Sequence, residues 1–242
     1  MPSQRLFLLS VVKDFGVVCL VKGKIINYKL NVKDVENSLA DNDVQTIIED
    51  KKGNIYFGTK AGLSVFDGKR FHNYSKKNGL PENNILSTYI DKENTIWIGT
   101  ANGLCSFKNN KFEIVRFPSN VQSAGKVVPV YNIFIDRNHT FWLASENGVI
   151  KYSGNTFQKF NQSNGFTSKR VISTLQDKSG YLWFGTDEGI FNYNYTSFVS
   201  INVNNGLAAN KVYLMLLNKD FLWIGTNNGI DKLDLQALNK LC

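Results

Sequence analysis

The amino-acid sequence predicts an all-β fold, a β-propeller built from four-stranded antiparallel blades. The first observation is a short pattern that occurs five times, at residues 55–63, 95–104, 141–149, 182–190 and 222–230. The second is its spacing, since one glycine of each copy stands at position 62, 103, 148, 189 or 229, between 40 and 45 residues from the next. The third is that each copy has the composition of strand, turn and strand. A repeat of this length and content is typical of one propeller blade.

Each copy opens with a short run of bulky apolar residues, such as Ile96-Trp97-Ile98. The run is too short for a helix, so we expect a strand covered on both faces. A glycine within the run predicts close approach of another backbone. This position holds Gly58, Gly99, Gly185 and Gly225, with Ala144 as the exception. The serine or threonine that follows is expected to make a turn or strand-edge hydrogen bond rather than to act in catalysis.

The second half of each copy predicts a hairpin turn. Asn102-Gly103, Asn147-Gly148 and Asn228-Gly229 favour a type I′ turn, in which both central residues have positive φ. A strand should follow each turn glycine. Another should lie about nine residues further on, where a large apolar residue is followed three positions later by a second one. These pairs are Phe71 and Tyr74, Phe112 and Val115, Phe157 and Phe160, and Phe198 and Ile201.

The first strand of each blade is expected before the repeated pattern, at residues 44–49, 85–90, 130–135, 171–175 and 212–217. An aspartate closes four of these strands, at Asp50, Asp91, Asp136 and Asp177. Aspartate suits such a turn because its side chain accepts a hydrogen bond from the backbone two residues on. One carboxylate per turn forms no cluster, so we predict no metal site.

We expect a single propeller domain over residues 1–242, with repeats at about 6–28, 43–75, 85–118, 129–161, 171–202 and 211–235. Four repeats are complete. The first lacks its first strand, and the last ends after its third strand. Both a closed ring and an open arc of a larger propeller are compatible with this count. An arc would expose apolar edges and would need a partner or a second propeller segment.

The composition is that of an ordinary globular protein, with 43% hydrophobic and 20% charged residues. The three cysteines show no metal or redox spacing and are expected to be free thiols. No segment is long enough to span a membrane. Residues 6–12 are apolar, but no small-residue cleavage site follows, so no clear signal peptide is predicted.

The formal net charge of +8 and the pI of about 9.3 raise a polyanion as a partner. The basic residues are scattered among acidic neighbours rather than clustered. Many fall in the turns of one predicted propeller face. We therefore expect a solvated turn face and no nucleic-acid partner.

No catalytic arrangement is found. The only histidines, His72 and His139, lie at non-equivalent positions of different repeats. No nucleophile elbow, metal-spaced set or phosphate-binding glycine loop is present. We predict no catalytic residue, no metal and no cofactor.

A ligand site is expected on the face shared by the second–third hairpins and by the loops that join consecutive blades. Amides and carboxylates suit a polyhydroxylated ligand, because each offers several donors or acceptors. As turn formers they also have a purely structural explanation. The candidate residues are Asn78, Asn102, Glu146, Asn147, Asn164, Asp187, Glu188, Asn227 and Asn228.

The repeat Asp-x-x-Gly-x-Ile-Trp-Ile-Gly-Thr-x-x-Gly-Leu resembles the two-component regulator propeller repeat. Its closest copies are residues 91–104 and 177–190. The resemblance implies the periplasmic sensor region of a hybrid histidine kinase or related regulator, often responsive to carbohydrate fragments. The chain itself shows no kinase, receiver or DNA-binding motif. The resulting hypothesis is a non-catalytic module that senses a small molecule, an oligosaccharide or a protein partner. The alternatives are a propeller enzyme of the streptogramin-lyase type and a protein-interaction scaffold.

Overall fold

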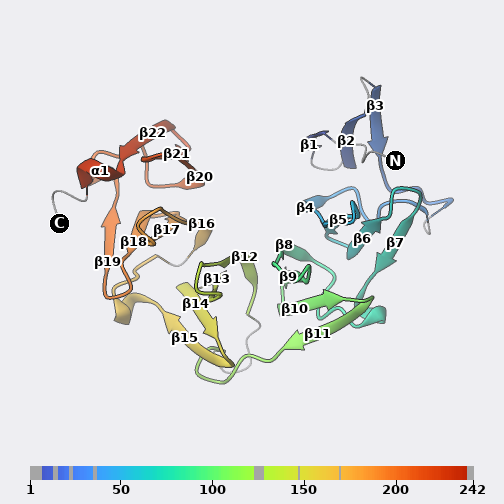
Figure 1. The fold of residues 1–242 in the computed structure, drawn as a ribbon, viewed down its shortest axis with the longest axis horizontal. Coiled ribbons are helices and arrows are strands. Elements are labelled where there is room, and N and C mark those ends of the chain that lie inside the picture. The colour runs from blue at the N-terminus through green and yellow to red at the C-terminus, as the bar shows by residue number, and fades with distance from the viewer. Residues whose placement is uncertain are drawn as a thin grey trace. The chain divides into compact units, whose positions relative to one another are not determined.

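The computed structural model describes residues 7–12, 16–21, 24–34, 37–122, 128–146, 148–168 and 170–238. Their strands form antiparallel sheets, each made of strands that are consecutive in the sequence. The chain divides into two compact units. The first is Met1–Arg116 with Val127–Val130, and the second is Phe117–Lys126 with Tyr131–Cys242. The strands of both units are labelled in Figure 1.

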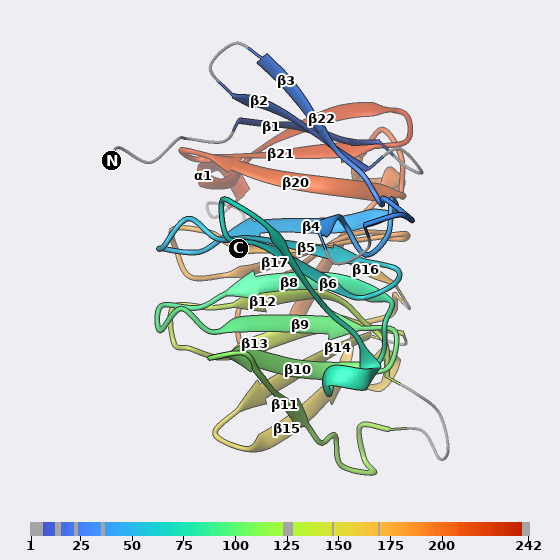
Figure 2. The same cartoon turned by 90° about the vertical axis from the view of Figure 1, so that its right-hand side faces the viewer.

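The described strands of the first unit form three sheets (Figure 2). Their strands are β1 (Phe7–Val12), β2 (Gly16–Val21) and β3 (Lys24–Tyr28); β4 (Val44–Glu49), β5 (Ile55–Thr59), β6 (Leu63–Phe66) and β7 (Phe71–Tyr74); and β8 (Ile85–Ile90), β9 (Ile96–Thr100), β10 (Gly103–Lys108) and β11 (Lys111–Val115).

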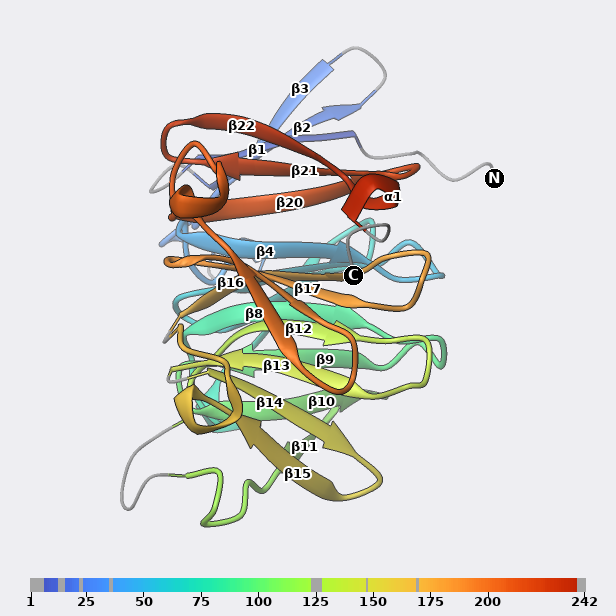
Figure 3. The ribbon, with the colours of Figure 1, turned by 90° about the vertical axis from the view of Figure 1, so that its left-hand side faces the viewer.

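The described strands of the second unit also form three sheets (Figure 3). Their strands are β12 (Val130–Ile135), β13 (Phe141–Ser145), β14 (Gly148–Ser153) and β15 (Thr156–Phe160); β16 (Val171–Gln176), β17 (Leu182–Thr186), β18 (Gly189–Tyr193) and β19 (Phe198–Ile201); and β20 (Val212–Asn218), β21 (Phe221–Thr226) and β22 (Gly229–Asp234). A short helix, α1 (Leu235–Leu238), follows β22.

These sheets confirm the predicted all-β fold with four complete and two partial blades. The first sheet lacks its first strand, because Val17 of β2 pairs with Tyr28 just as Leu63 pairs with Tyr74 in the next sheet. The last sheet ends at its third strand, β22. Each first strand that is expected from the sequence coincides with a strand of the structure to within one residue at either end.

The apolar cores lie between neighbouring sheets. In the first unit, one cluster joins Leu63 of the second sheet to Ile85 and Ile98 of the third. In the second unit, another joins Ile190 of one sheet to Val212 of the next. Within each unit, neighbouring sheets therefore cover one another, which explains why the second strands are rich in apolar residues.

The glycine within each second strand makes room for the next sheet. A Cβ on Gly99 would lie 2.5 Å from the carbonyl oxygen of Val130 and 2.8 Å from its Cγ1 atom. A Cβ on Gly185 would lie 2.8 Å from Cγ1 of Val212. The predicted close approach of another backbone is thus found at Gly99, whereas at Gly185 a side chain approaches instead.

The turn between the second and third strands is not type I′, so that prediction is wrong. Gly103 has φ +102° and Gly229 has φ +125°, but Asn102 and Asn228 are not left-handed. Thr100 pairs with Gly103, so the central residues of the turn are Ala101 and Asn102, and the glycine is the first residue of β10. The threonine before the turn stabilises this arrangement. Thr100 Oγ1 accepts a hydrogen bond from the amide of Asn102 and donates one to the carbonyl of Gly103. These bonds leave only the glycine in the left-handed region.

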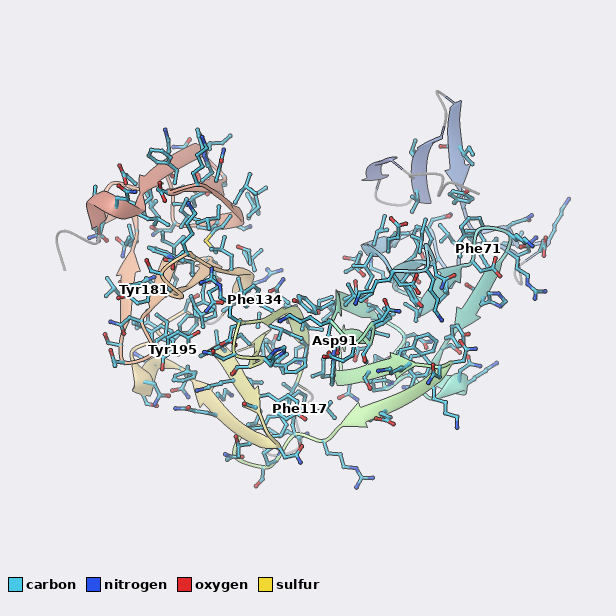
Figure 4. All side chains as sticks on the ribbon, viewed as in Figure 1. Phe71, Asp91, Phe117, Phe134, Tyr181 and Tyr195 are labelled. Carbon is cyan, nitrogen blue, oxygen red and sulfur yellow. The ribbon has the colours of Figure 1, made fainter. Side chains whose placement is uncertain are left out.

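The aspartate that closes a first strand binds both its turn and an aromatic side chain. Asp136 Oδ1 accepts hydrogen bonds from the amides of Asn138 and Thr140, two and four residues on. Its Oδ2 accepts from Trp142 Nε1 at 2.9 Å and from Tyr195 Oη at 3.2 Å; Tyr195 is labelled in Figure 4. The backbone bond expected two residues on is thus confirmed for this aspartate.

The other three aspartates make the same aromatic contact. Oδ2 accepts from the ring group six residues on, in the pairs Asp50–Tyr56, Asp91–Trp97 and Asp177–Trp183. The oxygens of these carboxylates therefore already accept hydrogen bonds within their own hairpins.

Candidate functional site

The second–third hairpins and the loops between blades share one face within each unit, as predicted. In the first unit, the amide of Ala101 donates to the carbonyl of Asn84. In the second, the amide of Asn227 donates to the carbonyl of Lys211, and Asn228 Nδ2 donates to the carbonyl of Ala208. These hydrogen bonds fix the hairpin tips against the loops.

The two candidates in the longer loops lie in short 3-10 helices. Asn78 ends the helix Lys76–Asn78, where its Oδ1 accepts hydrogen bonds from the amide and the hydroxyl of Ser75. Asn164 ends the helix Gln162–Asn164 and is exposed. A left-handed glycine follows each helix. The Asn78 side chain therefore serves as a helix cap, which leaves fewer of its polar groups for a ligand.

The candidates in the hairpins differ in their surroundings. Asn102 and Glu188 are exposed, and each donates its backbone amide to a threonine hydroxyl within the same turn. Asn147 lies outside the described residues. Glu146 and Asp187 stand out, because side chains from other elements reach both of them.

A polar cluster in the second unit contains these two carboxylates. Tyr131 Oη donates to Glu146 Oε1 over 3.5 Å, and the guanidinium carbon of Arg170 lies 5.8 Å from the centre of the Tyr131 ring. Glu146 and Arg170 also form an isolated antiparallel bridge. Ser168 Oγ donates to Asp187 Oδ1 at 2.8 Å and accepts the amide hydrogen bond of Arg170. We call these five residues the Glu146–Asp187 cluster.

The Glu146–Asp187 cluster offers varied recognition chemistry. Glu146, Arg170 and Asp187 are exposed, whereas Ser168 is buried and holds Asp187 in place. Burial and the nearby Glu146 carboxylate raise the pKa of Tyr131, and Arg170 acts in the opposite direction. The phenol therefore stays protonated at neutral pH and remains a donor. The cluster combines anionic acceptors, a cationic donor and an aromatic ring.

Sequence reasoning missed Tyr131, Ser168 and Arg170. Tyr131 is the second residue of β12. The corresponding residue is bulged out of the ladder in the other four first strands, between Val212 and Leu214 for example. In the last sheet that residue is Tyr213, and Lys211 Nζ lies 5.3 Å from the centre of its ring. Tyr131 and Arg170 belong to different repeats, so no local signal in the sequence paired them.

The basic turn residues on the opposite face have a structural role that the sequence did not reveal. Arg137 donates from its guanidinium to the carbonyls of Asp177 and Lys178 in the next turn. Lys51 Nζ donates to the carbonyl of Lys92 in the same manner. These side chains tie one sheet to the next within each unit.

The two histidines lie at turns. His72 Nε2 is 3.0 Å from Asp67 Oδ2 beside the β6–β7 turn. His139 is an exposed, left-handed residue of the β12–β13 turn. Within the part of the chain that the structure describes, no three His, Cys, Asp or Glu side chains gather in a group able to hold a metal ion.

Comparison with known proteins identifies the repeat. The family description "Two component regulator propeller" matches residues 38–61, 79–102 and 165–188. These segments are two-component regulator propeller repeats. Each matched segment of the propeller repeat covers a loop between blades and the first two strands of the blade that follows. The resemblance inferred from the sequence is thus confirmed.

Solved structures with similar propeller blades include extracellular domains from B. thetaiotaomicron. One, from a protein named as the hybrid two component system BT3049, has a TM-score of 0.77 and 24% identity over 94% of this chain and 32% of its own. Another, from BT4673, has a TM-score of 0.74 and 24% identity over 90% of this chain and 30% of its own. The present chain thus spans about a third of the length of these relatives.

A third structure, a catalytically inactive virginiamycin B lyase from Staphylococcus aureus, has a TM-score of 0.65 and 13% identity over 98% of this chain and 87% of its own. That likeness shows the propeller fold alone. No curated protein matches the chain. Among the described residues, no helix is long and apolar enough to cross a membrane.

Proposed function

We propose that the chain is a non-catalytic input module of a two-component type regulator, acting in the periplasm. The likeness to the extracellular domain of a hybrid two-component system over 94% of the chain carries this proposal. The propeller repeats at residues 38–61, 79–102 and 165–188 support it.

The module binds its ligand on the face that holds the Glu146–Asp187 cluster. Tyr131 supplies a half-buried ring that can lie against the apolar face of a sugar, and Arg170 supplies donors that carboxylates or hydroxyls accept. Glu146 and Asp187 supply acceptors for hydroxyl groups. This combination favours an oligosaccharide fragment as the ligand. The other seven candidates remain predicted contacts of the ligand. They are Asn78, Asn102, Asn147, Asn164, Glu188, Asn227 and Asn228.

The test is a panel of oligosaccharides screened by thermal shift, with hits measured by calorimetry. A ligand should raise the Tm, and Glu146→Gln and Arg170→Gln should each remove most of that rise. Both side chains are exposed, so the variants should unfold at the temperature of the parent chain when no ligand is present. Glu93→Gln, which changes an exposed carboxylate in the β8–β9 turn of the first unit, is the matched control. A panel without any hit, or hits that both cluster variants bind unchanged, would count against the proposal.

A further inference from the structure

Three of the loops that join consecutive blades share the same local structure. Each contains a short 3-10 helix, Lys76–Asn78, Gln162–Asn164 or Val203–Asn205, and a left-handed glycine follows the helix. The last residue of each helix and this glycine form an Asn-Gly pair. One asparagine can therefore be compared with two others in the same setting.

The side chain of the helix asparagine is held in two of these loops. Asn78 Oδ1 accepts hydrogen bonds from the amide of Ser75 at 2.8 Å and from its hydroxyl at 3.3 Å. Asn205 Oδ1 accepts from the amide of Asn202 at 3.1 Å. These bonds direct the carboxamide toward the residue three positions earlier, and so away from the glycine that follows.

Asn164 has no such bond within the part of the chain that the structure describes. The residue before its helix is Asn161, whose side chain accepts from the amide of Ser163 at 3.0 Å, but no hydrogen bond joins the Asn161 backbone to the Asn164 side chain. Asn164 is also exposed. Its carboxamide can therefore rotate toward the amide nitrogen of Gly165.

A second hydrogen bond separates the loops in the same way. The amide of Lys76 donates to Asn83 Oδ1 at 2.9 Å. The amide of Val203 donates to Asn210 Oδ1, also at 2.9 Å. The residue at the corresponding position of the remaining loop is Lys169, and a lysine side chain has no acceptor. The helix of that loop should therefore open more readily than its two counterparts.

Two further Asn-Gly pairs among the described residues, Asn102-Gly103 and Asn228-Gly229, are held by a sheet. In both, the glycine is the first residue of a strand, β10 or β22, and pairs across its hairpin. The amide of Gly103 also donates to the carbonyl of Val128 at 2.9 Å. The strands restrict the backbone movement that a reaction between the two residues would need.

We propose that Asn164-Gly165 is a site of spontaneous deamidation and the most reactive of the described Asn-Gly pairs. The amide nitrogen of Gly165 loses its proton and attacks Cγ of Asn164, and the side-chain amide leaves as ammonia. The five-membered succinimide then takes up water at one of its two carbonyl groups, which opens the ring to aspartate or isoaspartate. Glycine favours the attack because it has no Cβ and adopts many backbone conformations.

The modification changes the loop that carries part of the Glu146–Asp187 cluster. Ser168 and Arg170 follow Asn164 in this loop. Deamidation replaces the N–H donors of the side chain by a carboxylate and adds one negative charge. The reaction needs no ligand, so it takes place whether or not the chain binds an oligosaccharide.

The test is incubation of the full chain at pH 8, followed by peptide mass mapping that separates asparagine, aspartate and isoaspartate. Asn164 should be lost at least about threefold faster than Asn78 and Asn205, a ratio that one missing hydrogen bond allows. The same incubation in concentrated urea should bring the three rates together, because each asparagine then precedes a glycine in an unfolded chain.

Two variants loosen the protected loops one at a time. Asn83→Ala removes the acceptor that holds the first helix and should speed the loss of Asn78, while Asn205 in the same sample is the matched control. Asn210→Ala should speed the loss of Asn205, with Asn78 as its control. The urea midpoints of both variants check that the rest of the fold is kept.

Several results would overturn the proposal. One is an equal rate of loss in the three loops of the folded chain, and another is a faster rate at Asn102 or Asn228. A ratio that persists in urea would assign the reactivity to local sequence rather than to the missing hydrogen bonds. Rates that neither Asn83→Ala nor Asn210→Ala changes would also contradict it. A failed oligosaccharide screen would leave all of these rates as they are.

Discussion

Replacing the glycine inside the second strand by alanine should lower the free energy of unfolding in one sheet and leave it unchanged in another. Gly185 of β17 and Gly225 of β21 occupy the same position of the propeller repeat in the same unit. A methyl group on Gly185 would lie 2.8 Å from Val212 Cγ1 and 2.5 Å from Ser173 Oγ. Val212 is fully buried in the next core and has little room to move. On Gly225, the nearest atom would be Leu214 Cγ at 3.1 Å, on a side chain that is 57% exposed.

These surroundings set the expected free energies of unfolding. Overpacking a closed core costs about 1–3 kcal/mol, and replacing glycine by alanine within a strand returns roughly 0.5–1 kcal/mol. Gly185→Ala should therefore destabilise the chain by up to about 2.5 kcal/mol. Gly225→Ala should be neutral or slightly stabilising, because Leu214 can swing into solvent.

Urea unfolding followed by tryptophan fluorescence and circular dichroism measures both variants. The transition midpoint and its slope are compared, so that a change in cooperativity is separated from a change in stability. Equal destabilisation by the two substitutions would refute the reasoning. It would mean that the strand itself, rather than the following sheet, requires the glycine.

Three further predictions concern buried polar groups and a buried thiol. Asp136→Asn should lower the free energy of unfolding, measured by urea denaturation, by about 1–3 kcal/mol, because the new amide would face the buried Trp142 N–H. The double change Asp136→Asn with Trp142→Phe should lower it by less than the sum of the two single changes. Burial raises the pKa of Asp50, but hydrogen bonds from Asn54, Lys52 and Tyr56 outweigh burial and lower that pKa. The ionised carboxylate therefore stabilises the fold above about pH 4, and this stabilisation is lost as the pH falls through the folded-state pKa. The stability difference between the parent chain and Asp50→Asn should accordingly shrink on acidification. Burial raises the pKa of Cys105 to about 12, so its thiol should resist iodoacetamide at pH 8 until denaturant is added, as peptide mass mapping will reveal.

The strands were predictable from the sequence because three local signals agree at each blade. An apolar run, a glycine inside it and a turn glycine after it fix where β9 and β17 begin and end. The turn type was not predictable from the Asn-Gly pair alone. Thr100 competes for the amide of Asn102 and changes the conformation of the turn, and that bond depends on a side-chain rotamer.

The candidate site was only partly predictable. Glu146 and Asp187 were identified as polar turn residues, but so were several residues that cap their own loops. Tyr131 occupies the strand position that is bulged in the other four first strands, and Arg170 directly precedes β16. Neither position shows in a periodic pattern. The contact between them requires two blades to be packed together, which a sequence repeat does not describe.

The placement of the cores between sheets has a consequence for how such a gene can change length. Four of the described repeats carry the second-strand glycine, Gly58, Gly99, Gly185 or Gly225, that receives the following blade. A first-strand residue such as Val212 fills the space over the preceding glycine. A duplicated repeat therefore arrives with both halves of a fitting contact, and a deletion brings two compatible halves together. Gain or loss of a whole repeat changes the number of blades without creating a mismatched junction, whereas a break inside a repeat leaves a sheet with an unpaired edge strand.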